Sequence, residues 1–592
     1  MSRLITTALW ENINDDEEVI LLGEWCRIYA SGDAVRKNAP VLNYHWDDRE
    51  KAANDYKYLY ELSTRLIPLL AKQLNDLHGT RFSNCAWQLM IGNWLSQFLA
   101  VTFDRWEMLC LAQSMHSSLF SYVSEESQDL YIPHDSIQAG NQFYEDRWNH
   151  IFIGGLMNHF PSIQVIKKSN IIIPTTAAKE RGGKKLRLSQ FKVQIKRILL
   201  DFFAFFLKPR GKSNTDYVLV SNGLNFSNLC SLRFKLCGSF HYEPRFPVVP
   251  LVQYDGNMRQ WKLSSWESET QFEKVVKDSI PLWIPRSYVE GFTPLRKSIG
   301  SAKLPYHPDV IFTSGSHFSD DAFKIWAASR WDEGCKLVVG QHGGGPFHRY
   351  NGSTQFDLDV ADIYVTTGNG NRGYPNLQGV GQYWSRLKYG DWDDHGIALV
   401  VTVAMPRYFF DLRSMALAGQ MLCYFEDQFT FFGTLPARIQ KQALIRLYPA
   451  DYGWNQKLRW LDRFDTVKIA ESSTSITQLA KKVRIFISTY NATTYNESLA
   501  ANIPTVIYWD SNYWESAEWA KEDFDGLKTV GIFHETPESA AKHVEAIWDD
   551  VANWWFDSEL QAVREHFCES YAYRDPSVIS KLANVLREAG GE

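Results

Sequence analysis

The chain has 592 residues and a formal net charge of −6, with 45% hydrophobic and 22% charged residues. This composition predicts a globular protein with more than one domain, and the small net charge argues against a dedicated nucleic-acid binder. The eight cysteines form no CxxC pair and no Cys/His cluster with zinc spacing. We therefore expect free thiols in a reducing compartment and no structural zinc. No apolar run reaches the ~20 residues that span a membrane, and we expect a cytoplasmic protein.

The N-terminal region contains two short apolar runs, at residues 3–9 and 19–23, that predict strands. Residues 50–165 then show apolar residues at three- and four-residue spacing, which is typical of helices. The acidic loop between the two strands contains Asp16, and Glu24 follows the second strand. Both carboxylates are candidate general bases, although charge in such a loop is also typical of solvated surface.

A basic segment, residues 179–212, carries eleven Lys or Arg against two acids. Its apolar block, residues 198–207, is interrupted by Asp201 and is too short to span a bilayer. One interpretation is an interfacial helix on the anionic inner face of the cytoplasmic membrane. The other is a core helix with a solvated basic face, and the residues leave both open.

From residue 216 onwards, apolar runs that end in small or polar residues alternate with helical patterns, which predicts parallel strands joined by helices. One series lies within residues 216–368 and a second within residues 397–509. Two such series predict an α/β protein with a GT-B-like fold, in which two Rossmann-like domains face a cleft. The N-terminal domain would span residues 1–390 with a large helical insertion at about 50–210, and the C-terminal domain residues 391–592.

The stretch IFISTYNATTYNESLAANIPTVIYW places polar residues between two buried strands, where a helix begins. A helix N-terminus at the carboxyl end of a strand presents free N–H groups and a positive dipole end, and so suits a phosphate. The candidate donor-binding residues here are Thr489, Tyr490, Asn491, Thr493 and Thr494, and Glu497 one turn on could hold a ribose hydroxyl. Ordinary N-capping is the alternative, but it needs only one such residue.

The stretch LVVGQHGGGPFHRYN has three consecutive glycines after a strand, which let the backbone approach a ligand closely. We expect Gln341, Gly343 and Gly344 to lie at the donor, and His342 to act as acid, base or hydrogen-bond donor. The alternative is a tight turn around a histidine with a structural partner.

The stretch LIRLYPADYGW places Arg446, Tyr448 and Pro449 at the end of a strand in the second series. A guanidinium there could pair with a phosphate or a sugar carboxylate. An interdomain salt bridge is the alternative role for Arg446.

Together with LITTALWENINDDEEVILLGEWCRIY, these blocks resemble a family of bacterial surface-polysaccharide transferases, over residue 3 to about residue 560. Assigned relatives are similar to retaining pseudaminyltransferases. The resemblance implies transfer of a nonulosonic acid from a CMP donor to a sugar acceptor in capsule or lipopolysaccharide assembly, without a metal. The acceptor would bind to the N-terminal domain and the nucleotide sugar to the C-terminal domain. Tyr448 and Pro449 stand where bacterial sialyltransferases of this architecture carry His-Pro.

Two rival hypotheses remain at this stage. The first is a Kdo transferase, or a transferase or epimerase with a UDP- or CDP-linked donor, on the same fold. The second is a non-catalytic scaffold of a polysaccharide-assembly complex, docked through residues 179–212.

Overall fold

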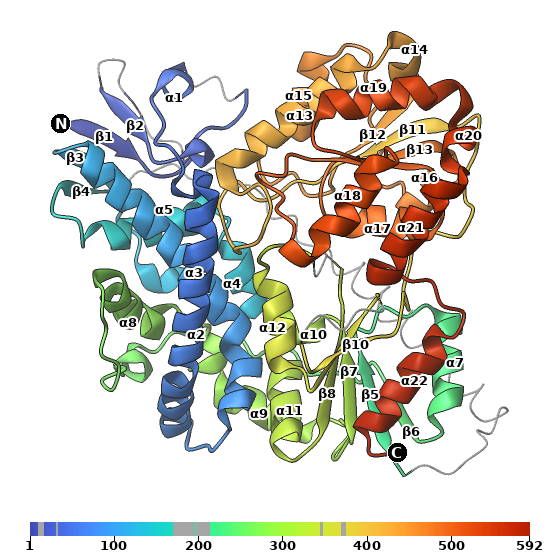
Figure 1. Cartoon of the computed structure of the whole chain (residues 1–592). Helices are drawn as coiled ribbons and strands as arrows, with labels where there is room; N and C mark the ends of the chain where they lie inside the picture. Colours follow the sequence, from blue (N-terminus) through green and yellow to red (C-terminus); the bar gives the residue numbers. More distant parts are fainter. Residues whose placement is uncertain are drawn as a thin grey trace.

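The computed structural model describes residues 1–9, 13, 17–30, 34–169, 196, 214–343, 347–368 and 374–592. Three parallel β-sheets with helices on their faces build three α/β units, which we call the N-terminal, middle and C-terminal units (Figure 1). In the described part of the chain, no helix is both long enough and apolar enough to cross a membrane. The basic segment 179–212 lies outside the described residues, apart from Lys196.

The N-terminal unit is a four-stranded sheet in the order β2-β1-β3-β4. Its strands are β1 (Ser2–Ile5), β2 (Val19–Leu21), β3 (Leu119–Ser124) and β4 (Ile163–Lys168), and its helices are α1 (Ala34–Asn38), α2 (Arg49–His78), α3 (Asn84–Met115), α4 (Ser136–Gln142) and α5 (Asp146–Met157). Helix α3 is apolar on all sides, as expected for a helix that other helices surround. Strands β3 and β4 interrupt the range 50–165 that the spacing predicts to be helical. Of the six residues of the edge strand β4, only Ile163 is buried, so this strand leaves little apolar signal in the sequence.

The middle unit is a six-stranded sheet in the order β10-β9-β8-β7-β5-β6. Its strands are β5 (Asp216–Val220), β6 (Ser239–Tyr242), β7 (Val310–Thr313), β8 (Lys336–Gly340), β9 (Ile363–Thr366) and β10 (Leu377–Gly379). The helices of this part of the chain are α7 (Phe226–Leu236), α8 (Gln271–Trp283), α9 (Phe292–Ser301), α10 (Ser316–Ser319), α11 (Asp321–Asp332) and α12 (Gly352–Val360).

The C-terminal unit is a five-stranded sheet in the order β12-β11-β13-β14-β15. Its strands are β11 (Ile397–Val401), β12 (Ala443–Arg446), β13 (Val483–Ser488), β14 (Thr505–Tyr508) and β15 (Phe533–His534). Its helices are α13 (Met421–Thr434), α14 (Ala437–Gln440), α15 (Gln456–Arg463), α16 (Ile476–Ala480), α17 (Thr493–Ala500), α18 (Lys521–Thr529), α19 (Pro537–Ile547), α20 (Val551–Trp555) and α21 (Ser558–Tyr571).

The predicted α/β fold with two facing Rossmann-like units is confirmed. The apolar runs predicted as strands within residues 216–368 and 397–509 all form parallel strands of the middle and C-terminal sheets. The sequence did not predict that β1 and β2 join β3 and β4 in a sheet of their own. The N-terminal unit is therefore a third α/β layer beside the other two (Figure 1).

The chain passes between the middle and C-terminal units twice. Residues 380–390 lead out of β10, and residues 572–577 lead from α21 back to α22 (Val578–Ala589). Helix α22 packs beside α7 on the middle sheet, although it falls within the range 391–592 predicted for the C-terminal domain. The two passages touch, since the Gln382 N–H donates to the Tyr573 carbonyl at 2.6 Å.

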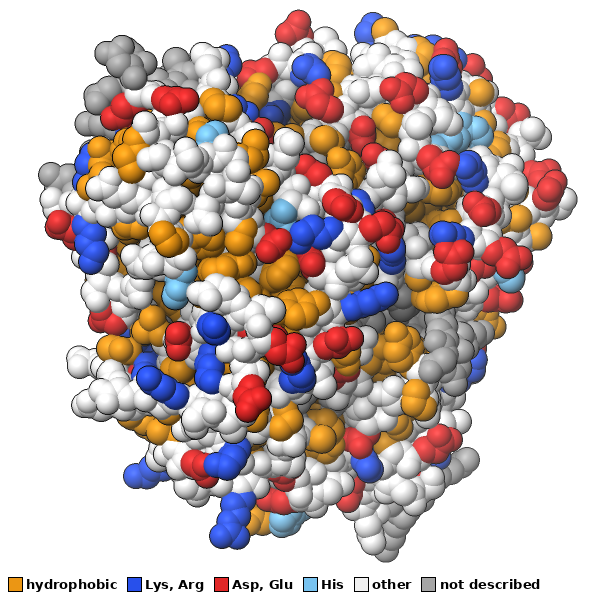
Figure 2. All heavy atoms as spheres, turned by 60° about the vertical axis from the view of Figure 1, so that its left-hand side comes forward, with side chains coloured by type: hydrophobic (Ala, Val, Ile, Leu, Met, Phe, Trp, Pro, Cys, Tyr) orange, Lys and Arg blue, Asp and Glu red, His pale blue; other side chains and the backbone are white. Residues whose placement is uncertain are grey.

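The loop between β11 and α13 contacts all three units. Arg407 and Tyr408 both donate to the Asp146 carboxylate of α5, each at 2.5 Å. The Ser414 N–H donates to the carbonyl of Tyr350, in the loop between β8 and α12, at 3.0 Å. This loop therefore ties the C-terminal unit to both of the others. On the side of the N-terminal unit, acidic and basic side chains are interspersed over the surface (Figure 2).

Two buried histidines make the stability of this arrangement sensitive to acid. The Ser124 N–H donates to His150 Nε2 at 3.0 Å, and His348 Nε2 donates to the Asn491 carbonyl at 2.8 Å. Burial lowers the pKa of each histidine from 6.5 to about 4. Below pH 6.5 the unfolded chain binds protons that the folded chain does not, so stability is lost as the pH falls from 6.5 towards 4.

We expect this loss to reach about 3 kcal/mol for each histidine. Urea unfolding between pH 7 and pH 4 measures it. His348→Gln retains a donor for the Asn491 carbonyl and should make the free energy of unfolding depend less on pH. Replacing the exposed His395 by Gln should leave that dependence unchanged. Equal slopes for the wild type and His348→Gln would contradict the assignment.

Candidate functional site

The carboxyl ends of β8 and β13 meet between the middle and C-terminal units. Gly343 has φ +139°, and a Cβ added to it would lie 2.9 Å from Thr493 Oγ1 at the start of α17. At this positive φ a larger residue would be strained, and the Thr493 side chain would have to shift, so the glycine permits the close approach. The sequence predicted both stretches as parts of one site, and the structure brings them together.

The N-cap of α17 is Ala492, whose methyl side chain cannot cap the helix, and no side-chain cap comes from the described residues. The polar residues before it serve other purposes: Thr489 and Asn491 are buried, and their side chains bond to Tyr424 and Tyr495 at 2.6 and 2.9 Å. They hold the shape of the turn, and a ligand would meet the helix terminus itself, where the dipole is positive.

Two of the predicted residues remain partly accessible beside this terminus. Thr493 and Thr494 are half-buried, and the hydroxyl of Tyr490 lies 2.5 Å from that of Thr494. The phenol of Tyr490 is buried, which raises its pKa. It therefore remains a neutral donor or acceptor at the edge of the site.

Arg446 ends β12 next to this cluster. Its guanidinium is partly buried, which lowers its pKa, and Tyr490 and Arg386 are close enough to affect that pKa. Its Nε is buried without a hydrogen-bond partner, and no ion pair to Arg446 occurs among the described residues. Within the described part of the chain, Arg446 therefore does not form the interdomain salt bridge that was the alternative to a ligand contact. A partly desolvated cation of this kind favours an anionic ligand.

Glu497 lies one turn into α17 and is completely buried. Arg386 Nε donates to Glu497 Oε1 at 3.2 Å, while Glu497 Oε2 is buried and has no hydrogen-bond partner among the described residues. Burial raises the pKa of Glu497, and the charge of Arg386 opposes that rise. The free oxygen can accept a hydrogen bond from a ligand hydroxyl.

His342 follows β8 in the middle unit, next to Gly343, and is exposed. A Cβ added to Gly315, at the end of β7, would lie 3.7 Å from His342 Nδ1 and also 3.7 Å from the Cβ of Ser221. The buried carboxylate of Asp357, bonded to His317 at 2.6 Å, lies within electrostatic reach of the imidazole. An exposed imidazole at this position can transfer a proton to a ligand or form a hydrogen bond with it.

The other predicted donor residues have mixed positions. Gln341 is buried, and its Oε1 accepts from the Thr367 N–H at 3.1 Å, so it supports the loop after β8. Tyr448 and Pro449 are exposed, and the Tyr448 ring stacks on Tyr452 at a centroid distance of 6.2 Å. Tyr448 is also close enough to Tyr490 to affect its pKa.

The candidate bases of the N-terminal unit lie elsewhere or outside the described residues. The Glu24 carboxylate accepts from Arg27 at 2.9 and 3.1 Å, and its side chain lies against Gly419 of the C-terminal unit. Glu24 therefore lies at an interface between the N-terminal and C-terminal units. Asp16 and Gly344 lie outside the described residues. Among the residues that are described, no three His, Cys, Asp or Glu side chains gather to hold a metal ion.

Sequence patterns did not reveal Arg386 or Asp357. Arg386 lies in the passage between the units, 111 residues before its partner Glu497. Asp357 lies on α12, where its sequence neighbours indicate only a helix. Neither has a local motif, and both acquire their position through packing between distant segments.

The chain is similar to one described protein family and to several solved structures. The chain matches the family described as LIC12162 family transferase over residues 2–586. No curated protein matches it. Among solved structures, it is similar to the spinosyn rhamnosyltransferase SpnG with spinosyn aglycone (11% identity, TM-score 0.32, 63% of this chain and 99% of that one).

Two further solved structures show a similar level of likeness. The wall teichoic acid polymerase TagF has 8% identity and a TM-score of 0.30, covering 69% of this chain and 97% of that one. WaaG, a glycosyltransferase involved in lipopolysaccharide biosynthesis, has 10% identity and a TM-score of 0.29, covering 62% and 99%. The family match extends over nearly the whole chain, and this protein belongs to the LIC12162 family of transferases.

Proposed function

We propose that the protein is a glycosyltransferase that moves a nonulosonic acid, of the pseudaminic acid kind, from a CMP donor to a sugar acceptor in capsule or lipopolysaccharide biosynthesis. One observation carries the proposal: Arg446, which has no ion-pair partner among the described residues, stands beside the start of α17 and the Glu497 carboxylate. Phosphate and ribose of a nucleotide would satisfy all three groups. Membership of a transferase family agrees with it.

In the transfer, the bond between the anomeric carbon and the phosphate oxygen breaks, and the acceptor oxygen bonds to that carbon. Negative charge then collects on the departing CMP phosphate, where Arg446 and the α17 dipole would stabilise it. Glu497 would accept a ribose hydroxyl and so orient the nucleotide. His342 would take the proton of the acceptor hydroxyl. These groups need no metal, and retention of configuration rests on the resemblance to pseudaminyltransferases.

The nucleotide that stabilises the protein against heat tests which nucleotide the donor carries. With CMP, CDP, UDP and GDP each at millimolar concentration, we expect CMP to raise the melting temperature by a few degrees, because a ligand at about 100 times its Kd adds about 2.7 kcal/mol. Glu497→Gln keeps the side-chain volume but weakens the acceptor for the ribose. It should abolish the CMP shift without lowering the melting temperature of the free protein.

The rival hypotheses give different results. A shift with UDP alone would keep the fold and overturn the CMP donor. No shift with any nucleotide, together with normal surface polysaccharide in cells that carry Glu497→Ala, would favour the non-catalytic scaffold. Membrane docking through residues 179–212 is a separate proposal, which binding to anionic liposomes tests, with the basic residues replaced in the matched variant.

A further inference from the structure

An open cavity of about 870 Å³ lies where the chain passes twice between the middle and C-terminal units. Residues 382–389 of the first passage and residues 572–576 of the second form much of its wall, and the ends of α7, α17, α21 and α22 complete it. Its volume is that of a site for a small organic ligand. Arg446, Tyr490, Thr494 and His342 do not line it, so it is separate from the donor cluster, although Arg386 borders both.

The cavity wall carries two positive charges that no described acidic residue pairs with. Lys388 and Arg574 form no ion pair among the described residues. The Arg574 guanidinium lies 5.6 Å from the centre of the Tyr389 ring, and its partial burial lowers its pKa. The start of α7, which Asn225 caps, adds the positive end of a helix dipole to the same wall.

The acids on the wall are mostly engaged. Glu565 pairs with Arg564 at 3.0 Å, and Asp575 with Lys581 at 2.5 Å. Glu569 is exposed. The free charges at this wall therefore favour an anion, because Lys388 and Arg574 exceed the one remaining carboxylate.

A polar group of the wall also has no partner among the residues that the structure describes. It is the buried Oε1 atom of Gln382, a residue of the first passage. A ligand that carries hydroxyl groups would donate to it, whereas inorganic anions such as sulfate would leave it unsatisfied. Anionic charge and hydroxyl groups together describe an acidic saccharide.

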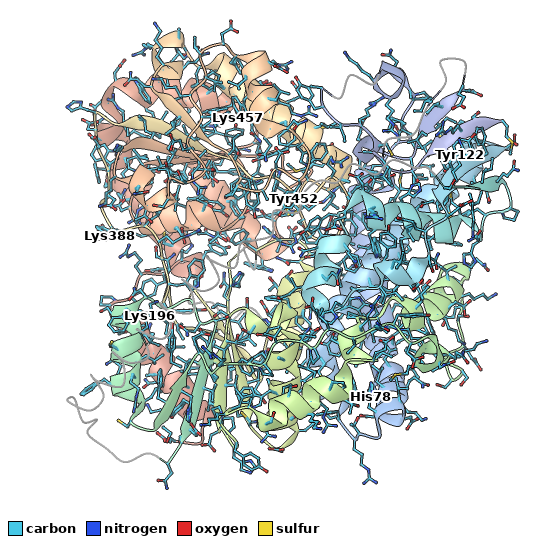
Figure 3. All side chains as sticks on the ribbon, turned by 180° about the vertical axis from the view of Figure 1, so that it is seen from behind. His78, Tyr122, Lys196, Lys388, Tyr452 and Lys457 are labelled. Carbon is cyan, nitrogen blue, oxygen red and sulfur yellow. The ribbon has the colours of Figure 1, made fainter. Side chains whose placement is uncertain are left out.

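We propose that this cavity between the two chain passages is a second saccharide site, which takes a sugar bearing a carboxylate or a phosphate. Lys388 and Arg574 bind the anionic group, and Gln382 accepts from a ring hydroxyl. Lys388 comes from the first passage and Arg574 from the second, so a bound sugar joins the two and fixes the middle and C-terminal units relative to each other. Lys388 lies between these two units in the view from behind (Figure 3).

Three sugars with one ring test the chemistry in the absence of any donor. Glucuronate carries a carboxylate at carbon 6, glucose 6-phosphate carries a phosphate there, and glucose is neutral. Isothermal titration calorimetry on the full chain should show binding of at least one of the two anionic sugars, and no binding of glucose at the same concentration. Which anionic sugar binds more tightly identifies the anionic group that the site prefers.

The double variant Lys388→Gln/Arg574→Gln should weaken binding of the anionic sugar at least about tenfold, because it removes two charge-assisted contacts. Lys457→Gln/Arg296→Gln is the matched control. It removes one exposed lysine and one arginine that lies over an aromatic ring, 5.3 Å from the centre of Phe82, and neither residue lines the cavity. The control should bind the sugar as the wild type does. Both the double variant and the control should keep the melting temperature of the wild type.

The proposal fails if neither anionic sugar binds, if glucose binds as tightly as they do, or if the control variant loses as much affinity as the double variant. It also fails if saturating CMP displaces the sugar, because the cavity would then be part of the donor cleft. Since no donor takes part in the binding experiment, an error in the donor assignment leaves its result intact.

Discussion

Replacing Arg446 by glutamine is expected to lower kcat/KM for glycosyl transfer by about two to three orders of magnitude, the usual effect of removing one group that stabilises charge in the transition state. The melting temperature should stay the same or rise. The wild-type guanidinium is partly buried and has no acidic partner among the described residues, so its removal relieves a desolvation cost. Steady-state kinetics with the donor that the thermal shift selects, and a melting curve, measure both effects.

Arg484→Gln is the control for this experiment. Arg484 is also partly buried in the C-terminal sheet, but it lies at the amino-terminal start of β13, at the opposite end from the site, and contacts Asp394 and Trp548. It should retain transfer activity. If Arg446→Gln remained fully active, or if both variants lost activity equally, Arg446 would have no role in binding the donor anion.

The largest effect on stability is expected at a buried ion pair of α3. The Arg105 guanidinium donates to the adjacent Asp104 carboxylate at 2.5 Å, and both side chains are at most 1% exposed. Arg105 also donates to the Phe409 carbonyl of the C-terminal unit at 2.9 Å. The pair therefore anchors the loop between β11 and α13 onto the N-terminal unit.

Asp104→Asn should lower the free energy of unfolding by about 3–5 kcal/mol, because it leaves the Arg105 charge buried without a counter-charge. Burial alone would raise the pKa of Asp104, but the Arg105 charge and hydrogen bonds from His45 and Tyr44 hold it below the ordinary 3.8. The stabilisation is therefore present at neutral pH and is lost only as the pH falls below about 3.8.

Urea unfolding at pH 7 measures the Asp104 effect. The control is Asp76→Asn, which breaks an exposed pair with Lys72 on α2 and should cost at most about 1 kcal/mol. A loss below 1 kcal/mol for Asp104→Asn would show that Arg105 finds compensation from its carbonyl partners alone.

The strands that flank the site were predictable because each is buried on both faces and ends in a polar or small residue. The glycine after His342 was also predictable, because few residues other than glycine allow two backbone segments to approach each other so closely. The individual polar residues before α17 were less predictable. Thr489 and Asn491 have side chains suited to a ligand, yet the fold buries both and uses them to hold the turn.

By itself, the sequence determined the parallel α/β character of the two facing units and the position of a helix start at the end of β13. Local periodicity and the placement of glycine and polar residues are properties of neighbouring positions, so one chain segment is enough to reveal them. Only the tertiary structure decided that β3 and β4 form a third sheet with β1 and β2, that Arg386 meets Glu497, and that Arg446 has no ion-pair partner within the described part of the chain. These features depend on burial and charge that distant segments supply when they pack, and no local pattern encodes that environment.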